Sequence, residues 1–241
     1  MRRTLTCLAL STLSVCATAH AESNLAQLSR LAPDANAQVI SLALEARACA
    51  AAQLGQAASP RLAVIDYSLP STTPRLWVFD VANNKLLFRE VVAHGQGTGE
   101  NMARNFSNQD GSHQTSLGLF RTADTYVGGN GYSLRMEGLE PGTNDAAMSR
   151  AIVMHGAPYV NLQNAKKQGR LGRSWGCPAV RPEVARQVID SLKNGQMIFS
   201  YYPNSNWLAK SPFIKCQDKA RAAMLAKSSP GTADRRVASA P

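Results

Sequence analysis

The stretch Ala151-Ile-Val-Met-His155-Gly156, followed by Gly172-Arg173-Ser174-Trp175-Gly176-Cys177-Pro178, guides the interpretation of the whole sequence. Its β-branched apolar beginning predicts a strand that runs directly into His155. A loop that contains glycine then leads to Cys177, and Pro178 restricts the backbone where the chain leaves that loop. This order predicts a site at the end of a strand, where an imidazole and a thiol lie together.

This pair of side chains points to nucleophilic catalysis. A thiol needs a base to become a nucleophile near neutral pH, and histidine has a suitable pKa, so we interpret Cys177 as the nucleophile and His155 as its base. Gly156 and Gly176 let the backbone approach a substrate carbonyl, and the N–H groups of Gly176 and Cys177 are the candidate oxyanion hole. The alternative is that Cys177 is a buried structural thiol or half of a disulfide.

The sequence on either side of this stretch predicts a mainly β fold with flanking helices, an α+β class. Short runs rich in valine, leucine, isoleucine and aromatic residues predict strands, at 61–67, 75–81, 85–92, 117–122, 133–136, 151–154 and 197–202. Asn83-Asn84 is typical of a hairpin turn. A helix is expected from Pro182, with Gly195 after its end.

Before the strands, residues 22–56 predict a docking helix. Pro33 and Asp34 or Asn36 open this helix, Gly55 closes it, and Cys49 falls on its buried stripe. Polar, glycine-rich loops are expected at 94–116, 125–132 and 138–149, and long loops in compact domains are often functional.

The catalytic stretch also carries a resemblance. His155-Gly156 followed by Ser174-x-Gly176-Cys177 resembles the L,D-transpeptidase catalytic domain family, often called YkuD-like, and most of all its exported murein subgroup in Gram-negative bacteria. The likeness covers roughly residues 60–202. It includes Ile65-Asp66-Tyr67-Ser68, His94-Gly95, Ser107-Asn108, Ser116-Leu117-Gly118, Gly131-Tyr132-Ser133-Leu134 and Gly169-Arg170-Leu171-Gly172-Arg173-Ser174.

The resemblance implies a mixed β-sandwich catalytic domain, which we place at 57–205, and a mechanism. Cys177 attacks the peptidoglycan tetrapeptide stem before its terminal D-Ala, forms a thioester and passes the acyl group to an amine. His155 is the base, oriented through a backbone carbonyl in the loop that follows it. No metal or organic cofactor is implied. A water acceptor would instead make the protein a carboxypeptidase or endopeptidase, and a third alternative is a non-catalytic wall-binding module.

The sequence departs from the commonest family pattern on both sides of the nucleophile. Trp175 stands where His or Arg is frequent, and Ala179 stands where an Arg is common. Another arginine must then hold the substrate carboxylate, and Arg173 or Arg181 is expected to do so. The histidine at 94 and the tyrosine at 132 are cleft candidates whose alternative role is structural. The candidate substrate-binding residues are Ser174, Arg173, Trp175, Arg181, His94 and Tyr132.

The first 21 residues are predicted to be a secretory signal peptide. Arg2 and Arg3 precede an apolar stretch, and Ala19-His20-Ala21 is a cleavage signal; a lipoprotein signal at Cys16 is the alternative. Export predicts a periplasmic protein in contact with peptidoglycan. The net charge of +10 fits anionic envelope polymers or membrane surfaces and equally fits plain solubility, whereas nucleic-acid motifs are lacking.

The cysteine count carries a further expectation. Removal of the signal leaves Cys49, Cys177 and Cys216, and an odd number in an oxidising compartment suggests one disulfide and one free thiol. We predict a Cys49–Cys216 disulfide; the alternative is two separate buried thiols. Residues 206–241 are predicted to be a basic C-terminal extension that is largely disordered after about 219.

Overall fold

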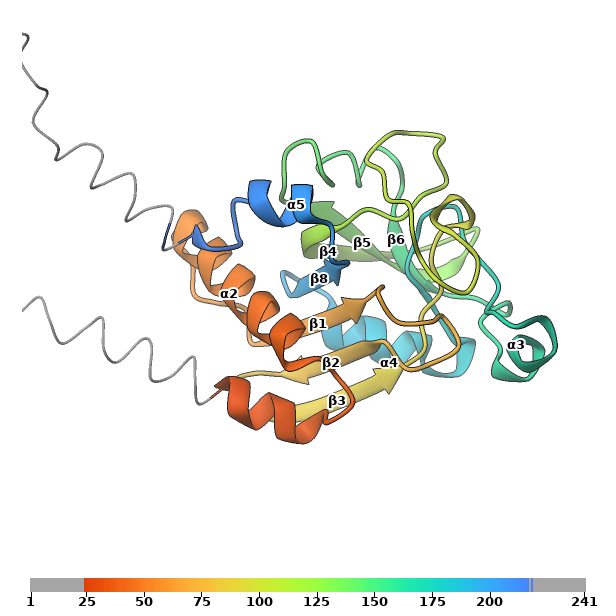
Figure 1. Ribbon diagram of the computed structural model, residues 1–241, viewed down its shortest axis with the longest axis horizontal. Helices are drawn as coiled ribbons and strands as arrows, with labels where there is room; N and C mark the ends of the chain where they lie inside the picture. The colour runs from red at the N-terminus through yellow and green to blue at the C-terminus, as the bar shows by residue number, and fades with distance from the viewer. Residues whose placement is uncertain (1–23, 217, 219–241) are drawn as a thin grey trace, which may run out of the picture.

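The computed structural model describes residues 24–216 and residue 218 (Figure 1). The predictions on the signal peptide and on the tail after residue 219 lie outside the described residues. Eight strands form one hydrogen-bonded sheet in the order β3-β2-β1-β8-β4-β5-β6-β7. The strands are β1 (Arg61–Asp66), β2 (Leu76–Asp80), β3 (Lys85–Glu90), β4 (Gly118–Gly128), β5 (Gly131–Gly138), β6 (Val153–Gly156), β7 (Ala179–Val180) and β8 (Met197–Tyr201).

The two ends of this sheet meet again, which gives it a barrel-like form. The chain that leaves β3 continues to Ala93, whose N–H donates to the carbonyl of Ala179 in β7 at 2.8 Å. Because β3 and β7 are the outermost strands of the sheet, this bridge joins its opposite edges. The mainly β fold is thereby confirmed, and the expected sandwich is a single curved sheet.

Helices cover the sheet on both faces, and the alternation of side chains along β1 shows how. Leu62 and Val64 pack in one core cluster with α2 (Ala37–Leu54), whereas Ala63 and Ile65 pack in a second cluster with α4 (Pro182–Leu192). Successive strand residues point to opposite faces, so one strand supplies both cores. This explains why β1 reads as a continuous apolar run with little polar alternation.

The N-terminal segment is two helices instead of one. Residues 24–31 form a first helix, and α2 begins after Asn36, whose side chain accepts from the backbone N–H of Gln38 at 2.9 Å. Gly55 closes α2 in a left-handed conformation with φ 61°, a backbone geometry that favours glycine. The expected opening at Asn36 and the expected end at Gly55 are confirmed, whereas the expectation of one helix over residues 22–56 is wrong.

Several elements were not predicted. The loop expected at 125–132 is instead the tip of a long hairpin, in which β4 runs to Gly128 and β5 starts at Gly131. Val127 at this tip is 79% exposed, so no buried face produces the apolar alternation that identifies a strand. The short elements α3 (Leu162–Gln168), α5 (Ser205–Lys210), β7 and a 3-10 turn at Gln96–Thr98 were also missed.

A buried arginine connects β2 to the segment that follows β3. Arg75 is 0% exposed, and its Nε and Nη2 donate to the carbonyl of Val92 at 3.1 and 2.8 Å. Its Nη1 donates to the carbonyl of Leu69 at 2.9 Å, and its Nη2 lies 2.7 Å from Nδ1 of His94. Burial lowers the pKa of Arg75 to about 10, so the guanidinium stays charged at neutral pH.

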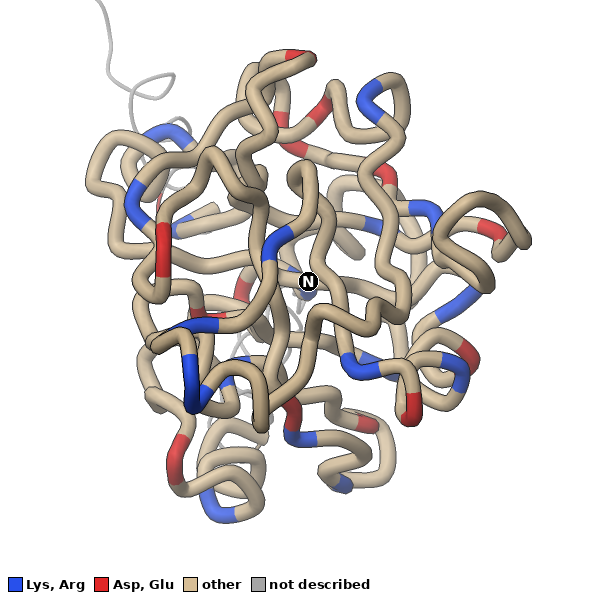
Figure 2. Tube along the Cα trace, turned by 90° about the vertical axis from the view of Figure 1, so that its right-hand side faces the viewer, with Lys and Arg blue, Asp and Glu red and all other residues tan. Residues whose placement is uncertain are grey.

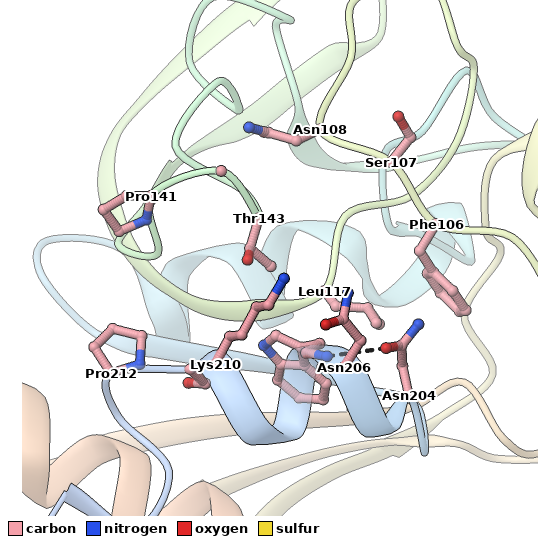
Figure 3. Close-up of a pocket in the computed structure, with 13 residues that line it drawn as sticks. Phe106, Ser107, Asn108, Leu117, Pro141, Thr143, Asn204, Asn206, Lys210 and Pro212 are labelled. Carbon is pink, nitrogen blue, oxygen red and sulfur yellow. Dashed lines mark hydrogen bonds between the residues drawn. The ribbon is translucent and has the colours of Figure 1, made fainter. Parts of the chain in front are cut away.

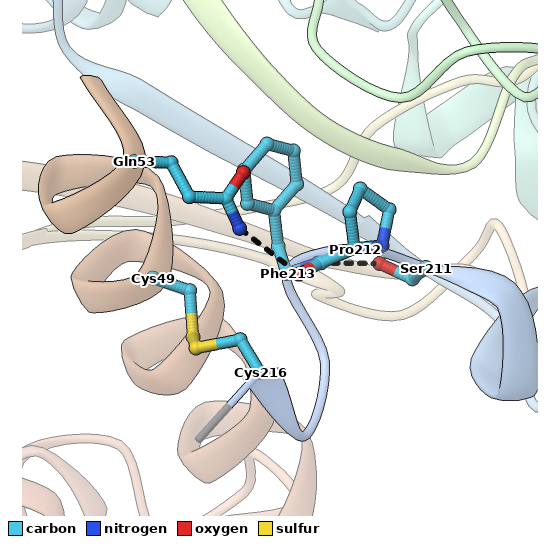
Figure 4. The surroundings of a disulfide bond; sticks show 6 residues. All are labelled: Cys49, Gln53, Ser211, Pro212, Phe213 and Cys216. Carbon is cyan, nitrogen blue, oxygen red and sulfur yellow. Dashed lines mark hydrogen bonds between the residues drawn. A yellow bond between two sulfur atoms is a disulfide. The ribbon is translucent and has the colours of Figure 1, made fainter. Parts of the chain in front are cut away.

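A disulfide joins α2 to the end of the described chain (Figure 4). The Cα atoms of Cys49 and Cys216 are 6.2 Å apart, which confirms the predicted pairing and leaves Cys177 as a free, buried thiol. Beside the disulfide, Nε2 of Gln53 donates to the carbonyl of Pro212 at 3.2 Å. Phe213 packs in the same core cluster as α2, so the disulfide reinforces an apolar contact.

Replacing Arg75 with methionine should lower the free energy of unfolding by about 2–5 kcal/mol, because buried carbonyls lose their donor. Urea unfolding followed by circular dichroism would measure this. Arg89→Met is the matched control, since Arg89 pairs with Asp34 at a site where the arginine side chain is 48% exposed. An exposed pair contributes at most about 1 kcal/mol. Equal losses in the two variants would contradict a special role for Arg75.

The double variant Cys49→Ser, Cys216→Ser should unfold at a lower temperature. The disulfide spans 167 residues, and a loop of that length stabilises by about 5 kcal/mol on the chain-entropy model. For a domain of this size we expect the melting temperature to fall by about 10 °C in calorimetry. Wild type measured in reducing agent is the control. An unchanged melting temperature would mean that the disulfide adds no constraint.

Candidate active site

The pairing of β6 with β7 places the thiol beside the strand that ends in the imidazole. His155 of β6 is in register with Ala179 of β7, and Cys177 lies two residues before that partner. The N–H of Val153 donates to Sγ of Cys177 at 3.4 Å, and the thiol lies 3.7 Å from the carbonyl of Ala151. Val153 and His155 are two residues apart on one strand, so their side chains lie on the same face. The thiol therefore lies against β6, the strand that also carries His155.

The imidazole of His155 is oriented by the backbone next to it. Nδ1 lies 3.0 Å from the carbonyl oxygen of Gly156, and a carbonyl only accepts, so Nδ1 carries the proton. The opposite nitrogen, Nε2, is then the one able to accept a proton. His155 is 4% exposed, and this burial lowers its pKa, which keeps the ring neutral near pH 7. A neutral imidazole with a lone pair on Nε2 is the form that a general base requires.

Gly156 has a packing role beside its carbonyl. A Cβ at this position would meet the Cβ of Ala185 in α4 at 2.7 Å, closer than real Cβ atoms approach. Glycine therefore lets α4 pack tightly against the end of β6. The close approach positions the carbonyl that orients His155.

The thiol of Cys177 is held in its protonated form at rest. Burial raises its pKa, while the N–H of Val153 and the charge of Arg150 act in the opposite direction with smaller effect. Burial therefore makes both groups of the pair favour the neutral state. A neutral thiol and a neutral imidazole suit a mechanism in which the proton moves from Cys177 to His155 during attack on a carbonyl. They fit less well with a thiolate–imidazolium ion pair that is already formed in the resting state.

Ser174 braces the loop that carries the nucleophile. Its Oγ donates to the carbonyl of Cys177 at 2.6 Å and accepts from the N–H of Gly176 at 3.1 Å. The side chain is buried and makes both of these hydrogen bonds within the loop, so Ser174 has a structural role here, and its substrate contact stays a prediction. Gly176 adopts φ 126°, a conformation that favours glycine.

This brace also changes the predicted oxyanion hole. Because the N–H of Gly176 already donates to Ser174, it is a poor second donor for a developing oxyanion. The N–H of Cys177 is therefore the stronger candidate of the two, and the oxyanion hole stays a prediction.

The two arginines that were expected to hold a substrate carboxylate are paired within the chain. Arg181 donates to both carboxylate oxygens of Glu90, at 2.9 and 2.6 Å, which ties the start of α4 to the end of β3. Arg173 donates to Glu100 at 2.7 Å and to the carbonyl of Gly99 at 2.9 Å. Long-range ion pairs of this kind are not visible in the local sequence, and the role of either arginine in binding a substrate carboxylate stays a prediction.

His94 and Tyr132 also make contacts within the chain, which fit the structural alternative for both residues; their substrate contacts stay predictions. His94 is 1% exposed; Arg75 donates to its Nδ1, and its Nε2 donates to the carbonyl of Gly99 at 3.2 Å. Burial, together with the charge of Arg75, lowers the pKa of His94 to about 4, so the ring remains neutral. The hydroxyl of Tyr132 donates to Asp190 of α4 at 2.7 Å, which joins β5 to that helix.

Trp175 remains accessible next to the nucleophile. It is 71% exposed, and its ring stacks on that of His113 with centroids 4.9 Å apart and an angle of 6° between the planes. Exposed tryptophans of this kind commonly serve recognition. Among the predicted substrate-binding residues, Trp175 is therefore the one that we retain.

Arg150 is the functional candidate that sequence reasoning missed. Its Nη1 donates to the carbonyl of Ser107 and to Oγ of Ser116, at 2.8 and 2.7 Å, and its Nη2 donates to the carbonyl of Gln114 at 2.7 Å. The guanidinium lies near the nucleophile loop, and its charge favours the thiolate of Cys177. No local motif marks this residue, because its partners come from the long loop at 94–116.

Within residues 24–216 and 218, no three His, Cys, Asp or Glu side chains gather where they could hold a metal ion. None of the described helices is long and apolar enough to cross a membrane.

The fold is similar at low identity to solved L,D-transpeptidase structures. One from Mycobacterium smegmatis is 16% identical with TM-score 0.38, covering 61% of each chain. L,D-transpeptidase 1 from Mycobacterium tuberculosis is 14% identical with TM-score 0.34, covering 61% of this chain and 64% of that one. One from Stackebrandtia nassauensis is 13% identical with TM-score 0.35, covering 76% and 91%. The chain thus spans less than two thirds of the two mycobacterial proteins.

No curated protein matches the sequence. The decisive comparison is with protein-family models, where residues 31–201 match the L,D-transpeptidase catalytic domain. This match covers well over half of the sequence and includes both His155 and Cys177. The chain therefore belongs to the L,D-transpeptidase catalytic domain family.

Proposed function

We propose that this protein is a peptidoglycan L,D-transpeptidase that uses Cys177 as its nucleophile. The observation that carries the proposal is the position of the free thiol of Cys177 against strand β6. The same strand carries His155, whose Nδ1 is hydrogen-bonded to the carbonyl of Gly156. Membership of the family supplies the substrate class, the stem peptides of peptidoglycan.

The first half-reaction follows from the neutral pair. As Sγ of Cys177 attacks the carbonyl before the terminal D-Ala, Nε2 of His155 takes the thiol proton. The Cys177 N–H stabilises the oxyanion of the tetrahedral intermediate. His155 then returns the proton to the departing amine of D-Ala, the C–N bond breaks, and a thioester remains.

The second half-reaction reverses these roles. The amine of a neighbouring stem attacks the thioester carbonyl while Nε2 of His155 removes its proton. The C–S bond breaks, and His155 returns the proton to the sulfur, which regenerates the resting thiol. A water molecule in place of the amine would give hydrolysis, so the acceptor must be determined by the products.

We also propose that the protein is exported to the periplasm, in the Gram-negative subgroup. The predicted signal peptide at 1–21 and the Cys49–Cys216 disulfide support this location, since disulfides persist in oxidising compartments. The distribution of charged residues does not single out a binding surface for anionic polymers. Lys and Arg alternate with Asp and Glu over the described fold (Figure 2), so binding to anionic polymers stays a prediction.

Cys177→Ala should remove all turnover of stem peptides while the protein stays folded. The thiol is the group that forms the thioester, and alanine fills the buried site without a nucleophile. Mass spectrometry of the peptide products is the measurement, with circular dichroism as the control for folding. Dimers in wild type mean transfer, and shortened monomers mean hydrolysis. Turnover by folded Cys177→Ala protein would contradict the proposal.

His155→Ala should lower turnover by about 10²–10⁴-fold, the usual contribution of a general base. It should also change how fast iodoacetamide labels Cys177 at different pH. In wild type the labelling rate should rise with pH as His155 loses its proton. This rise should occur below the ordinary pKa of histidine, because burial lowers the pKa of His155. Without His155 the rate should rise only near the pKa of the thiol, which burial raises.

His113→Ala is the matched control for the labelling experiment. Its ring belongs to the same part of the molecule but stacks on Trp175. We expect the wild-type profile in that variant. An unchanged profile in His155→Ala would show that another group activates the thiol.

A further inference from the structure

A groove lies between α5 and two loops, on the side of the molecule where the chain returns after β8 (Figure 3). We call it the α5 groove. Its volume is about 400 Å³, which is within the range of sites for small ligands. Its lining residues are Phe106, Ser107, Asn108, Leu117, Pro141, Gly142, Thr143, Asn204, Asn206, Trp207, Lys210, Ser211 and Pro212.

The walls of the α5 groove are held in place by hydrogen bonds. Nδ2 of Asn108 donates to Asp145 at 2.7 Å, and its Oδ1 accepts from the N–H of Ala146 at 3.1 Å. On the other wall, Oδ1 of Asn204 accepts from the N–H of Trp207 at 2.9 Å. A preformed site loses little entropy when it binds a ligand, which favours binding.

Three polar side chains in the groove have no partner in the described part of the chain. Lys210, Asn206 and Thr143 make no hydrogen bond or ion pair through their side chains there, and Figure 3 shows Lys210 extended across the groove toward Thr143. Asn206 and Lys210 are four residues apart on α5, so they share one face of the helix.

The lining residues carry one positive charge and no negative charge. Two carboxylates border the groove, and both accept hydrogen bonds within the chain. That of Asp145 accepts from Asn108 and from the N–H of Gly142 at 2.8 Å, and that of Glu140 accepts from Nε1 of Trp207 at 2.8 Å. An ammonium beside amide and hydroxyl groups suits a carboxylate on a polar, amide-rich chain. That chemistry describes a peptide with a free carboxylate.

A single residue, Arg150, connects the groove with the loop that carries Cys177. The backbone of Ser107 lines the groove, and its carbonyl accepts from Nη1 of Arg150. The other end of that guanidinium, Nη2, would lie 3.5 Å from a Cβ placed on Gly176. Arg150 therefore lies against both the wall of the groove and the loop that carries Cys177.

We propose that the α5 groove binds the acceptor stem peptide, with Lys210 holding one of its carboxylates. This inference rests on the proposed transferase function, which requires two peptides to be bound at once. The donor occupies the site at Cys177, and the acceptor approaches from the α5 groove with its amine directed at the thioester.

The first test is binding to the full chain carrying Cys177→Ala, so that no turnover occurs. A stem tetrapeptide and the same peptide with its carboxylates amidated are titrated in turn. NMR signals of the side-chain amides of Asn108, Asn204 and Asn206 report the groove directly. We expect the carboxylate peptide to shift these signals, and Lys210→Ala to weaken its binding about tenfold, the effect of one charge-assisted hydrogen bond.

Two matched comparisons make this test specific. Lys166→Ala, in the last turn of α3, removes an exposed lysine elsewhere and should leave binding unchanged. Removing the carboxylates from the peptide should weaken binding as much as removing the lysine from the protein. The amidated peptide should therefore bind the protein that keeps Lys210 no more tightly than the carboxylate peptide binds the Lys210→Ala variant. Equal binding of both peptides, or equal shifts caused by acetate alone, would overturn the assignment.

The second test separates this inference from the proposed function. In the protein with Cys177 intact, formation of the thioester is followed by intact mass, and dimer formation is followed against acceptor concentration. We expect Lys210→Ala to raise the half-saturating acceptor concentration about tenfold, with thioester formation unchanged. Unchanged dimer formation would overturn the acceptor site alone. Failure of the unmodified protein to form any thioester would overturn the proposed function and, with it, the acceptor role.

Discussion

The guanidinium of Arg75 and the backbone that surrounds it set the position of the nucleophile. Arg75 donates to the carbonyl of Val92 and to His94, and the carbonyl of His94 accepts from the N–H of Ser174 at 3.0 Å. Ser174 in turn bonds to the carbonyl of Cys177. A buried charge satisfied by carbonyls is costly to disturb, so this chain of contacts keeps the loop in one register. His94 has to stay neutral for the chain to hold, and its low pKa ensures that.

How much of this could be predicted from sequence depends on the range of each interaction. The strand into His155 and the Gly-Cys loop carry local patterns, and both were located correctly. The ion pairs of Arg173 and Arg181 could not be predicted, because their partners, Glu100 and Glu90, are far away in the sequence. A basic side chain near a motif has the same appearance whether it binds substrate or closes an ion pair.

The same limit applies to the fold. Strands with one or two buried faces have recognisable composition, whereas β7 has only two residues and no measurable period. Its existence depends on the pairing with His155 on one side and Ala93 on the other. The α5 groove was invisible for a related reason, since its walls come from three separate segments of the chain.

The burial of Cys177 has a consequence for the survival of the enzyme. Oxidation to sulfenic and sulfinic acids follows thiolate character and exposure, and Cys177 is 8% exposed with a raised pKa. A buried, neutral thiol is expected to react slowly with peroxides and with other disulfides, and Cys49 and Cys216 are already paired with each other. On the proposed mechanism, in which the thiol becomes reactive only as His155 takes its proton, Cys177 is thus protected from oxidative inactivation between turnovers.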